Sequence, residues 1–256
     1  MVLPLGDDNS DRRIVPYVTW MLIACNVVVF VVFQQLGEND AFTMSFSAVP
    51  QEIATGRDIE TPPQLIRHPI THELVRVPGL GPTPVPVYFT LLTSMFMHGS
   101  VMHLLGNMLY LWIFGDNVED RMGHGRYLAY YLVCGLIASL AHVLTSLGGP
   151  AAEVPSLGAS GAISGIQGGY LLLFPHKWVR VIVGRFLTEV PAFVAIGLWF
   201  LFQIVSSLAA GPSGGGVAYA AHIGGFLAGL ALVVPFAWRA PAVIYRDRYG
   251  RPWRAE

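Results

Sequence analysis

Six long apolar segments, separated by shorter polar ones, constrain the fold of this chain more than any other feature. The first runs from about Ile14 to Phe33, close to the 20 or so residues that a helix needs to cross about 30 Å of hydrocarbon. Charged residues make up only 12% of the chain, about half their share in ordinary soluble domains. We therefore predict an all-α membrane protein whose six transmembrane helices cover residues 14–33, 100–114, 127–147, 160–174, 190–208 and 217–238.

The same pattern divides the chain into three parts: an N-terminal segment (1–13), a six-helix membrane domain (14–238) and a C-terminal tail (239–256). The membrane domain contains a long proline-rich loop, residues 34–97, which we expect to be partly folded on the membrane surface. The fourth apolar run is short for a complete crossing. We therefore expect it to begin below the membrane surface, beneath a cavity lined by loops.

The basic residues indicate how the chain is oriented. Most of them lie in the N-terminal segment, in the loops after the second and fourth apolar runs, and in the tail, which six spans place on one side. Only Arg57, Arg67 and Arg76 lie opposite, in the long loop, where charge has less influence. The positive-inside rule predicts that both termini are cytoplasmic, which places the start of the fourth run near the outer face.

Composition also excludes several classes of function. The net charge of −1 provides no basic surface for nucleic acid, so we expect no nucleic-acid partner. The two cysteines, Cys25 and Cys134, both lie in apolar runs, which favours buried thiols over a disulfide framework.

Two apolar runs carry the residue types of a serine nucleophile and its general base. Ser160 lies in the small-residue segment Gly158-Ala159-Ser160-Gly161-Ala162, and His222 lies in the sixth run. A base activates a serine when it is within about 2.6–3.2 Å of the hydroxyl. No apolar run contains Asp or Glu as a third member, so the sequence offers a dyad. The same absence argues against a proton-coupled transporter.

Small residues at helical spacing accompany both candidates. Such stripes are more often packing faces than active sites. A short serine–histidine hydrogen bond between two helices also requires close packing, so the two interpretations are compatible. The predicted packing residues are Gly158, Gly161, Gly225 and Gly229.

A second polar group lies near the start of the second run. His103 and Asn107 are four residues apart and share one helix face, and His98 precedes them. Polar side chains in membrane helices usually face the bundle interior. They are either hydrogen-bonding contacts between helices or donors for an oxyanion, with His98 at the rim of the same cavity. His103 and His222 could alternatively bind haem or a metal. The sequence contains no further ligand pair and no Cys-x-x-Cys-His motif, so we expect neither a metal nor a cofactor.

Taken together, these motifs resemble those of the rhomboid intramembrane serine proteases. The matching segments are His98-Gly99 with His103-x-x-x-Asn107, Gly158-Ala159-Ser160-Gly161, Ala221-His222-x-x-Gly225-x-x-x-Gly229, and the turn Glu119-x-Arg121-x-Gly123. The resemblance covers about residues 14–238. It implies a rhomboid-like bundle in which a short fourth helix carries the nucleophile.

The resemblance also implies roles and partners. Ser160 would be the nucleophile and His222 the base. The Ser160 N–H would bind the oxyanion together with His103 and Asn107, supported by His98. The substrates would be transmembrane segments of single-span or other membrane proteins, cut within the bilayer. The implied location is the cytoplasmic membrane of a prokaryote, and no oligomeric state is implied. A catalytically silent relative that only binds membrane proteins is the alternative.

The sequence departs from many relatives at one position. An aromatic residue often follows the nucleophile by four positions and supports the histidine ring, whereas this chain has Ser164 there. The orientation of His222 must then come from other contacts, and Tyr219 and Phe226 are the candidates near it in sequence.

Overall fold

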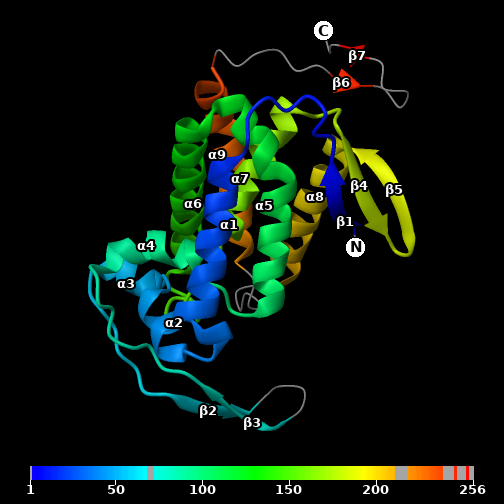
Figure 1. The fold of residues 1–256 in the computed structure, drawn as a ribbon. Helices are drawn as coiled ribbons and strands as arrows, with labels where there is room; N and C mark the ends of the chain where they lie inside the picture. The colour runs from blue at the N-terminus through cyan, green and yellow to red at the C-terminus, as the bar shows by residue number, and fades with distance from the viewer. Residues whose placement is uncertain (1, 68–71, 211–217, 239–244, 247–251, 254–256) are drawn as a thin grey trace.

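The structure is a computed structural model of a helical bundle with a small sheet at one end and a folded loop at the other (Figure 1). It describes residues 2–67, 72–210, 218–238, 245–246 and 252–253. The bundle helices are α1 (Tyr17–Val28, continued by the π-helical turn Val29–Phe33), α5 (Val101–Met122), α6 (His124–Ser146), α7 (Ser160–Leu173), α8 (Ala192–Ala210) and α9 (Tyr219–Phe236). We call the two ends of this bundle the sheet end and the loop end.

Among the described residues, α6, α8 and α9 are long and apolar enough to cross a membrane. The apolar helix Tyr17–Phe33 is shorter, as is Val87–Phe96. The bundle helices also carry large apolar side chains on their outer surfaces, such as Trp112, Leu144 and Leu201, which are more than half exposed. Exposed apolar residues in such numbers are typical of a surface that faces lipid.

The loop end is built from the long connection between the first two apolar runs. Much of this connection has regular structure. Its elements are α2 (Asp40–Phe46), α3 (Pro50–Thr55), β2 (Gln64–Arg67), β3 (Leu74–Val77), α4 (Thr90–Thr93) and the 3-10 turns Gln35–Gly37, Val87–Phe89 and Ser94–Phe96. The strands β2 and β3 form an antiparallel hairpin that extends away from the bundle (Figure 1).

The sheet end contains three antiparallel strands in the order β1-β4-β5, where β1 is Val2–Asp7, β4 is Trp178–Val183 and β5 is Phe186–Pro191. The chain is therefore mostly helical, as predicted, but it is not all-α. In β4, Val179 and Val181 are buried while Arg180 between them is exposed, the alternation of a strand with one covered face. The tail adds the short strands β6 (Tyr245–Arg246) and β7 (Pro252–Trp253).

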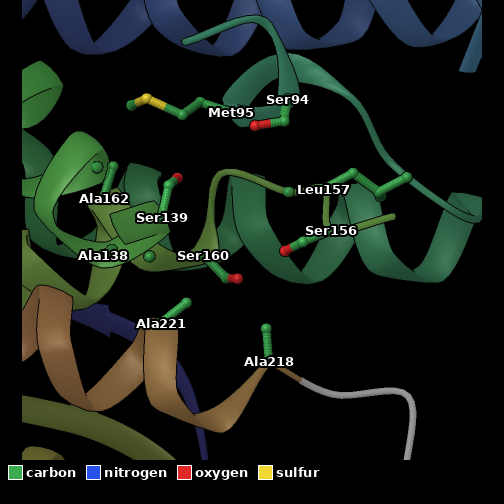
Figure 2. Close-up of a pocket in the computed structure, with 13 residues that line it drawn as sticks. Ser94, Met95, Ala138, Ser139, Ser156, Leu157, Ser160, Ala162, Ala218 and Ala221 are labelled. Carbon is green, nitrogen blue, oxygen red and sulfur yellow. The ribbon is translucent and has the colours of Figure 1, made fainter. Parts of the chain in front are cut away.

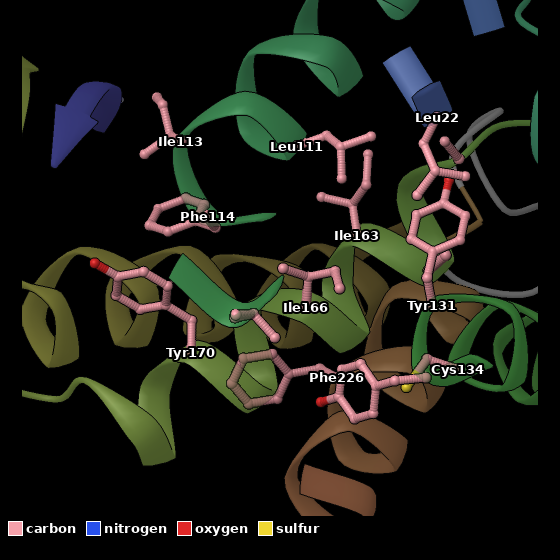
Figure 3. Close-up of a cluster of buried hydrophobic side chains, with 14 of the residues drawn as sticks. Leu22, Leu111, Ile113, Phe114, Tyr131, Cys134, Ile163, Ile166, Tyr170 and Phe226 are labelled. Atoms are coloured by element: carbon pink, nitrogen blue, oxygen red, sulfur yellow. The ribbon is translucent and has the colours of Figure 1, made fainter. Parts of the chain in front are cut away.

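Helix α7 lies at the centre of the bundle. Every residue from 161 to 170 is buried, and the side chains of Ile163, Ile166 and Tyr170 pack into the main apolar cluster (Figure 3). Glycines allow α9 to approach α7 closely. A Cβ on Gly225 would lie 2.1 Å from the carbonyl oxygen of Gly161, and no side chain can be accommodated there.

Helix α5 is longer than the sequence predicted, because it continues through the charged segment after Phe114 as far as Met122. The acidic side chains of this extension have partners. Glu119, fully buried, accepts hydrogen bonds from the backbone N–H groups of Val18 and Thr19 at the start of α1, at 2.9 and 2.8 Å. A carboxylate at a helix N-terminus is favourable, so these acids join α5 to α1 and do not end the helix.

Candidate active site

The two residues predicted as nucleophile and base lie next to each other. Ser160 is the first residue of α7, and His222 lies in the first turn of α9. The Ser160 Oγ and the His222 Nε2 are 2.8 Å apart, although the residues are 62 positions apart in the sequence. Both side chains are partly exposed. The distance is that of a hydrogen bond through which a hydroxyl proton could pass to an imidazole.

A glutamine on a third helix contacts the other nitrogen of the same histidine. The Oε1 of Gln203, on α8, lies 2.8 Å from His222 Nδ1. An amide oxygen can only accept a hydrogen bond, so Nδ1 carries the proton of a neutral ring. The lone pair of Nε2 is then free to accept the hydroxyl proton of Ser160.

Sequence reasoning missed Gln203. The polar contact to His222 Nδ1 comes from Gln203, and not from Tyr219 or Phe226, the two aromatic residues suggested by their position in the sequence. An amide inside an otherwise apolar run was the available signal, since polar residues of membrane helices usually face inward.

Ser164, at the position where relatives often have an aromatic residue, is fully buried. Its Oγ donates a hydrogen bond to the carbonyl oxygen of Ser160 at 2.7 Å. This side chain is therefore occupied within its own helix. An aromatic ring beside His222 is that of Trp199, on α8, whose centroid lies 6.1 Å away.

Gly158 brings His103 close to the start of α7. Its φ of +124° is one that L side chains rarely adopt. A Cβ at this position would also lie 2.9 Å from the His103 ring and 3.7 Å from the Ser160 Oγ. The loop therefore passes against the His103 ring at the nucleophile. A backbone hydrogen bond from Gly158 N–H to the Ser94 carbonyl, 2.9 Å long, holds the loop in place.

Asn107 and His98 form a buried pair beside this histidine. The Asn107 Nδ2 lies 2.9 Å from His98 Nε2, and the His98 and His103 rings meet edge to face at 5.1 Å. Asn107 therefore has one of its two amide hydrogens left for another acceptor. His98, in the loop that precedes α5, thus contacts both His103 and Asn107, the pair predicted on one face of that helix.

Gln34 holds His98 in position, and sequence reasoning missed this residue too. Its Oε1 accepts a hydrogen bond from the His98 backbone N–H, and its Nε2 donates one to the His98 carbonyl, both at 2.9 Å. Gln34 is fully buried at the end of the first apolar helix. Its position at the start of a long loop carried no signal of this role.

A small cavity opens at Ser160, whose hydroxyl points into it (Figure 2). The hydroxyls of Ser139 and Ser156 also line the cavity (Figure 2). The first N–H groups of a helix have no acceptor within it, and the first helical bond of α7 runs from Ile163 N–H to Ala159. The backbone N–H groups at the start of α7 are therefore donors that an anion could use. The other residues that line the cavity are Ser94, Met95, Gly135, Ala138, Leu157, Gly158, Gly161, Ala162, Ala218 and Ala221.

Within the described part of the chain, no group of three or more His, Cys, Asp or Glu side chains is arranged to hold a metal ion. The loop between the fifth and sixth apolar runs falls mostly on residues 211–217, outside the described residues.

Comparison with known proteins identifies the family. The sequence profile of the Rhomboid domain matches residues 86–239, more than half of the chain. The chain belongs to the rhomboid family. The matched region contains every site residue described above except Gln34. One relative is named a rhomboid protease, and this chain is a membrane protein of the same family.

Three relatives show the range of similarity. Rhomboid protease GluP of Bacillus subtilis (strain 168) is 36% identical over 152 residues, which are 59% of this chain and 27% of the relative. Rhomboid protein 1, mitochondrial, of Saccharomyces cerevisiae is 32% identical over 168 residues, 63% of this chain and 44% of the relative. RHOMBOID-like protein 5 of Arabidopsis thaliana is 28% identical over 236 residues, which are 85% of this chain and 68% of the relative. The matches thus cover less than half of the first two relatives.

Proposed function

We propose that this rhomboid is an intramembrane serine endopeptidase in which Ser160 is the nucleophile and His222 the general base. The observation that carries the proposal is the 2.8 Å distance between Ser160 Oγ and His222 Nε2, on two helices of a rhomboid-family bundle. The Nδ1 proton implied by Gln203 supports the assignment, because it leaves Nε2 able to accept a proton.

The reaction follows from these positions. Ser160 Oγ attacks the carbonyl carbon of the scissile peptide bond as its proton passes to His222 Nε2. The protonated histidine then donates this proton to the leaving amine, and the acyl-enzyme forms. A water molecule, deprotonated by His222, hydrolyses the ester and restores the serine. No metal or cofactor takes part.

The negative charge that develops on the carbonyl oxygen needs donors. The backbone N–H groups at the start of α7 have no helical acceptor, and the His103 ring and the Asn107 amide are the side chains proposed to join them. His98 holds the Asn107 amide through their 2.9 Å contact. Loss of one such donor typically costs an enzyme about 10²–10³-fold in kcat.

The substrates we propose are transmembrane segments of other membrane proteins. A peptide bond inside a regular helix has its carbonyl hydrogen-bonded, so the segment must unwind before attack. Segments with glycine or proline near the cleavage point unwind at least cost. We propose six spans with both termini in the cytoplasm of a prokaryote. In this orientation Ser160 lies near the outer face, and water reaches the site from that side.

The decisive test is cleavage of a single-span substrate in proteoliposomes by the wild-type protein and by Ser160→Ala. Thermal unfolding of both proteins controls for folding. We expect the wild type to cleave and the folded variant to be inactive. A serine-reactive fluorophosphonate should label the wild type at Ser160. No cleavage and no labelling by a folded wild type would refute the proposal and favour a silent binder of membrane proteins. Equal cleavage by both proteins would refute the assignment of Ser160.

A further inference from the structure

Helix α8 is anchored to the bundle very unevenly along its length. At the sheet end, Ala192, Ala195 and Ile196 are buried at 0, 7 and 1% exposure. Over residues 197–209, Gln203 is the one residue of the described chain that is buried, at 5% exposure. Its neighbour Phe202 is 63% exposed. The half of α8 nearest the active site therefore inserts one fully covered side chain into the bundle, and that side chain is polar.

The contact made by Gln203 is chemically specific. Because its Oε1 can only accept, the 2.8 Å contact to His222 Nδ1 requires the proton to be on that nitrogen. Without this acceptor, the Nδ1 proton would lose its 2.8 Å partner. The ring would then be free to turn, or to move its proton to Nε2, where it would block proton transfer from Ser160.

We propose that Gln203 is a positioning residue, which holds His222 in the one tautomer and orientation that can accept the Ser160 proton. This inference rests on the proposed function and deepens it. It also has a mechanical consequence. Gln203 is on α8 and His222 on α9, so any separation of these two helices near the active site breaks the hydrogen bond. His222 then loses the orientation in which its Nε2 can accept the Ser160 proton. Reaction then requires α8 to be seated against α9.

The test compares Gln203→Leu, Gln203→Glu and the control Phe202→Leu, an exposed position on the same helix, in proteoliposome cleavage assays. We expect Gln203→Leu to lower kcat about 10- to 100-fold, part of the 10²–10⁴-fold that a positioned base supplies, with KM nearly unchanged. Labelling of Ser160 by the fluorophosphonate should slow to a similar extent, because that small probe reports the nucleophile without the substrate helix. Phe202→Leu should match the wild type in both assays.

Gln203→Glu gives a readout that a merely structural role would not produce. A carboxylate facing Nδ1 stabilises the imidazolium ion, so the acidic limb of the kcat profile should move to higher pH, by about one unit or more. His103 and His142 also act electrostatically on His222, and both are unchanged in every variant. They therefore contribute equally to the pH profile of kcat in the wild type and in each variant. Because the glutamate keeps a polar acceptor in place, this variant decides the question even if Gln203→Leu does not fold.

The outcomes separate this inference from the proposed function. If the wild type cleaves, Ser160→Ala does not, and both Gln203 variants retain kcat within twofold with an unshifted pH profile, the positioning role is refuted while the protease assignment stands. If Ser160→Ala cleaves as well as the wild type, the protease assignment itself fails.

Discussion

One oxygen of the Asp7 carboxyl group, in β1, accepts a 2.6 Å hydrogen bond from the hydroxyl of Tyr170, near the end of α7. The two residues are 163 positions apart. Asn117, on α5, donates to the same carboxyl oxygen at 2.7 Å, and the Lys177 Nζ donates to the Asn117 side-chain oxygen at 2.6 Å. The first strand of the chain thus holds the far end of the helix that begins at Ser160.

This contact makes stability depend on pH. Burial, with the nearby Asp116 charge as a smaller cause, raises the pKa of Asp7 from 3.8 to about 8. The unfolded chain therefore loses this proton at about pH 4, while the folded protein keeps it until about pH 8, so the free energy of unfolding falls as pH rises between those values. We expect Asp7→Asn to flatten this part of the profile of the thermal unfolding midpoint.

The neighbouring Asp8 provides the control, because within the described part of the chain its side chain accepts a local bond from the exposed N–H of Ser10 and no other. Asp8→Asn should keep the wild-type slope between about pH 4 and pH 8. An Asp7→Asn profile with the same slope as the wild type would show that Asp7 is ionised in the folded protein at neutral pH.

Tyr130 joins the two helices that carry Ser160 and His222. Its hydroxyl lies 2.9 Å from the Gly165 carbonyl on α7 and 2.8 Å from the Gly229 carbonyl on α9. We expect Tyr130→Phe to lower the free energy of unfolding by about 0.5–1.5 kcal/mol, because it removes the hydrogen bond that this buried hydroxyl donates to one of the two carbonyls. Chemical denaturation in detergent measures this. Tyr131→Phe is the matched control, since the Tyr131 hydroxyl is buried without a hydrogen-bond partner among the described residues. Equal losses in the two variants would contradict the bridging role.

Close packing of α7 on α9 should be sensitive to a single methyl group. In Gly225→Ala the new Cβ would lie 2.1 Å from the Gly161 carbonyl, so the helices must separate. We expect a loss of about 1–3 kcal/mol in stability and slower cleavage, because Gly161 follows Ser160 directly. Gly106→Ala, where a Cβ meets nothing within 4 Å, should leave both unchanged. The prediction fails if Gly225→Ala melts and cleaves like Gly106→Ala.

Gly158 should matter to activity through His103. Gly158→Ala introduces both an unfavourable backbone conformation and a Cβ 2.9 Å from the His103 ring. We expect kcat to fall about 10- to 100-fold, the scale of a small misplacement of catalytic groups. Gly148→Ala separates the two causes, because Gly148 also has a positive φ, +74°, but an added Cβ there meets nothing within 4 Å. If both variants lose kcat equally, the contact with His103 is not the reason.

The apolar runs were enough to predict a membrane-embedded helical bundle, and the resemblance of a few motifs pointed to the rhomboid family. Hydrophobic length is a local property, and the family match confirms what it indicated. The candidates Ser160 and His222 were also identified from local signals, a serine among small residues and a histidine in an apolar run. Their 2.8 Å separation supports the same pair.

Tertiary structure decided the contacts that join distant segments. Gln203 and Gln34 each contact a predicted site residue, but their partners are 19 and 64 positions away, and no periodic pattern encodes such a pairing. The same holds for the strand pair in which Leu3 lies opposite Ile182, which made the all-α prediction incomplete. Local sequence determined which segments are apolar and which residues can carry chemistry. Only the packing of the helices determined which polar group faces each nitrogen of His222, because a hydrogen-bond partner is selected by distance in space and not by distance along the chain.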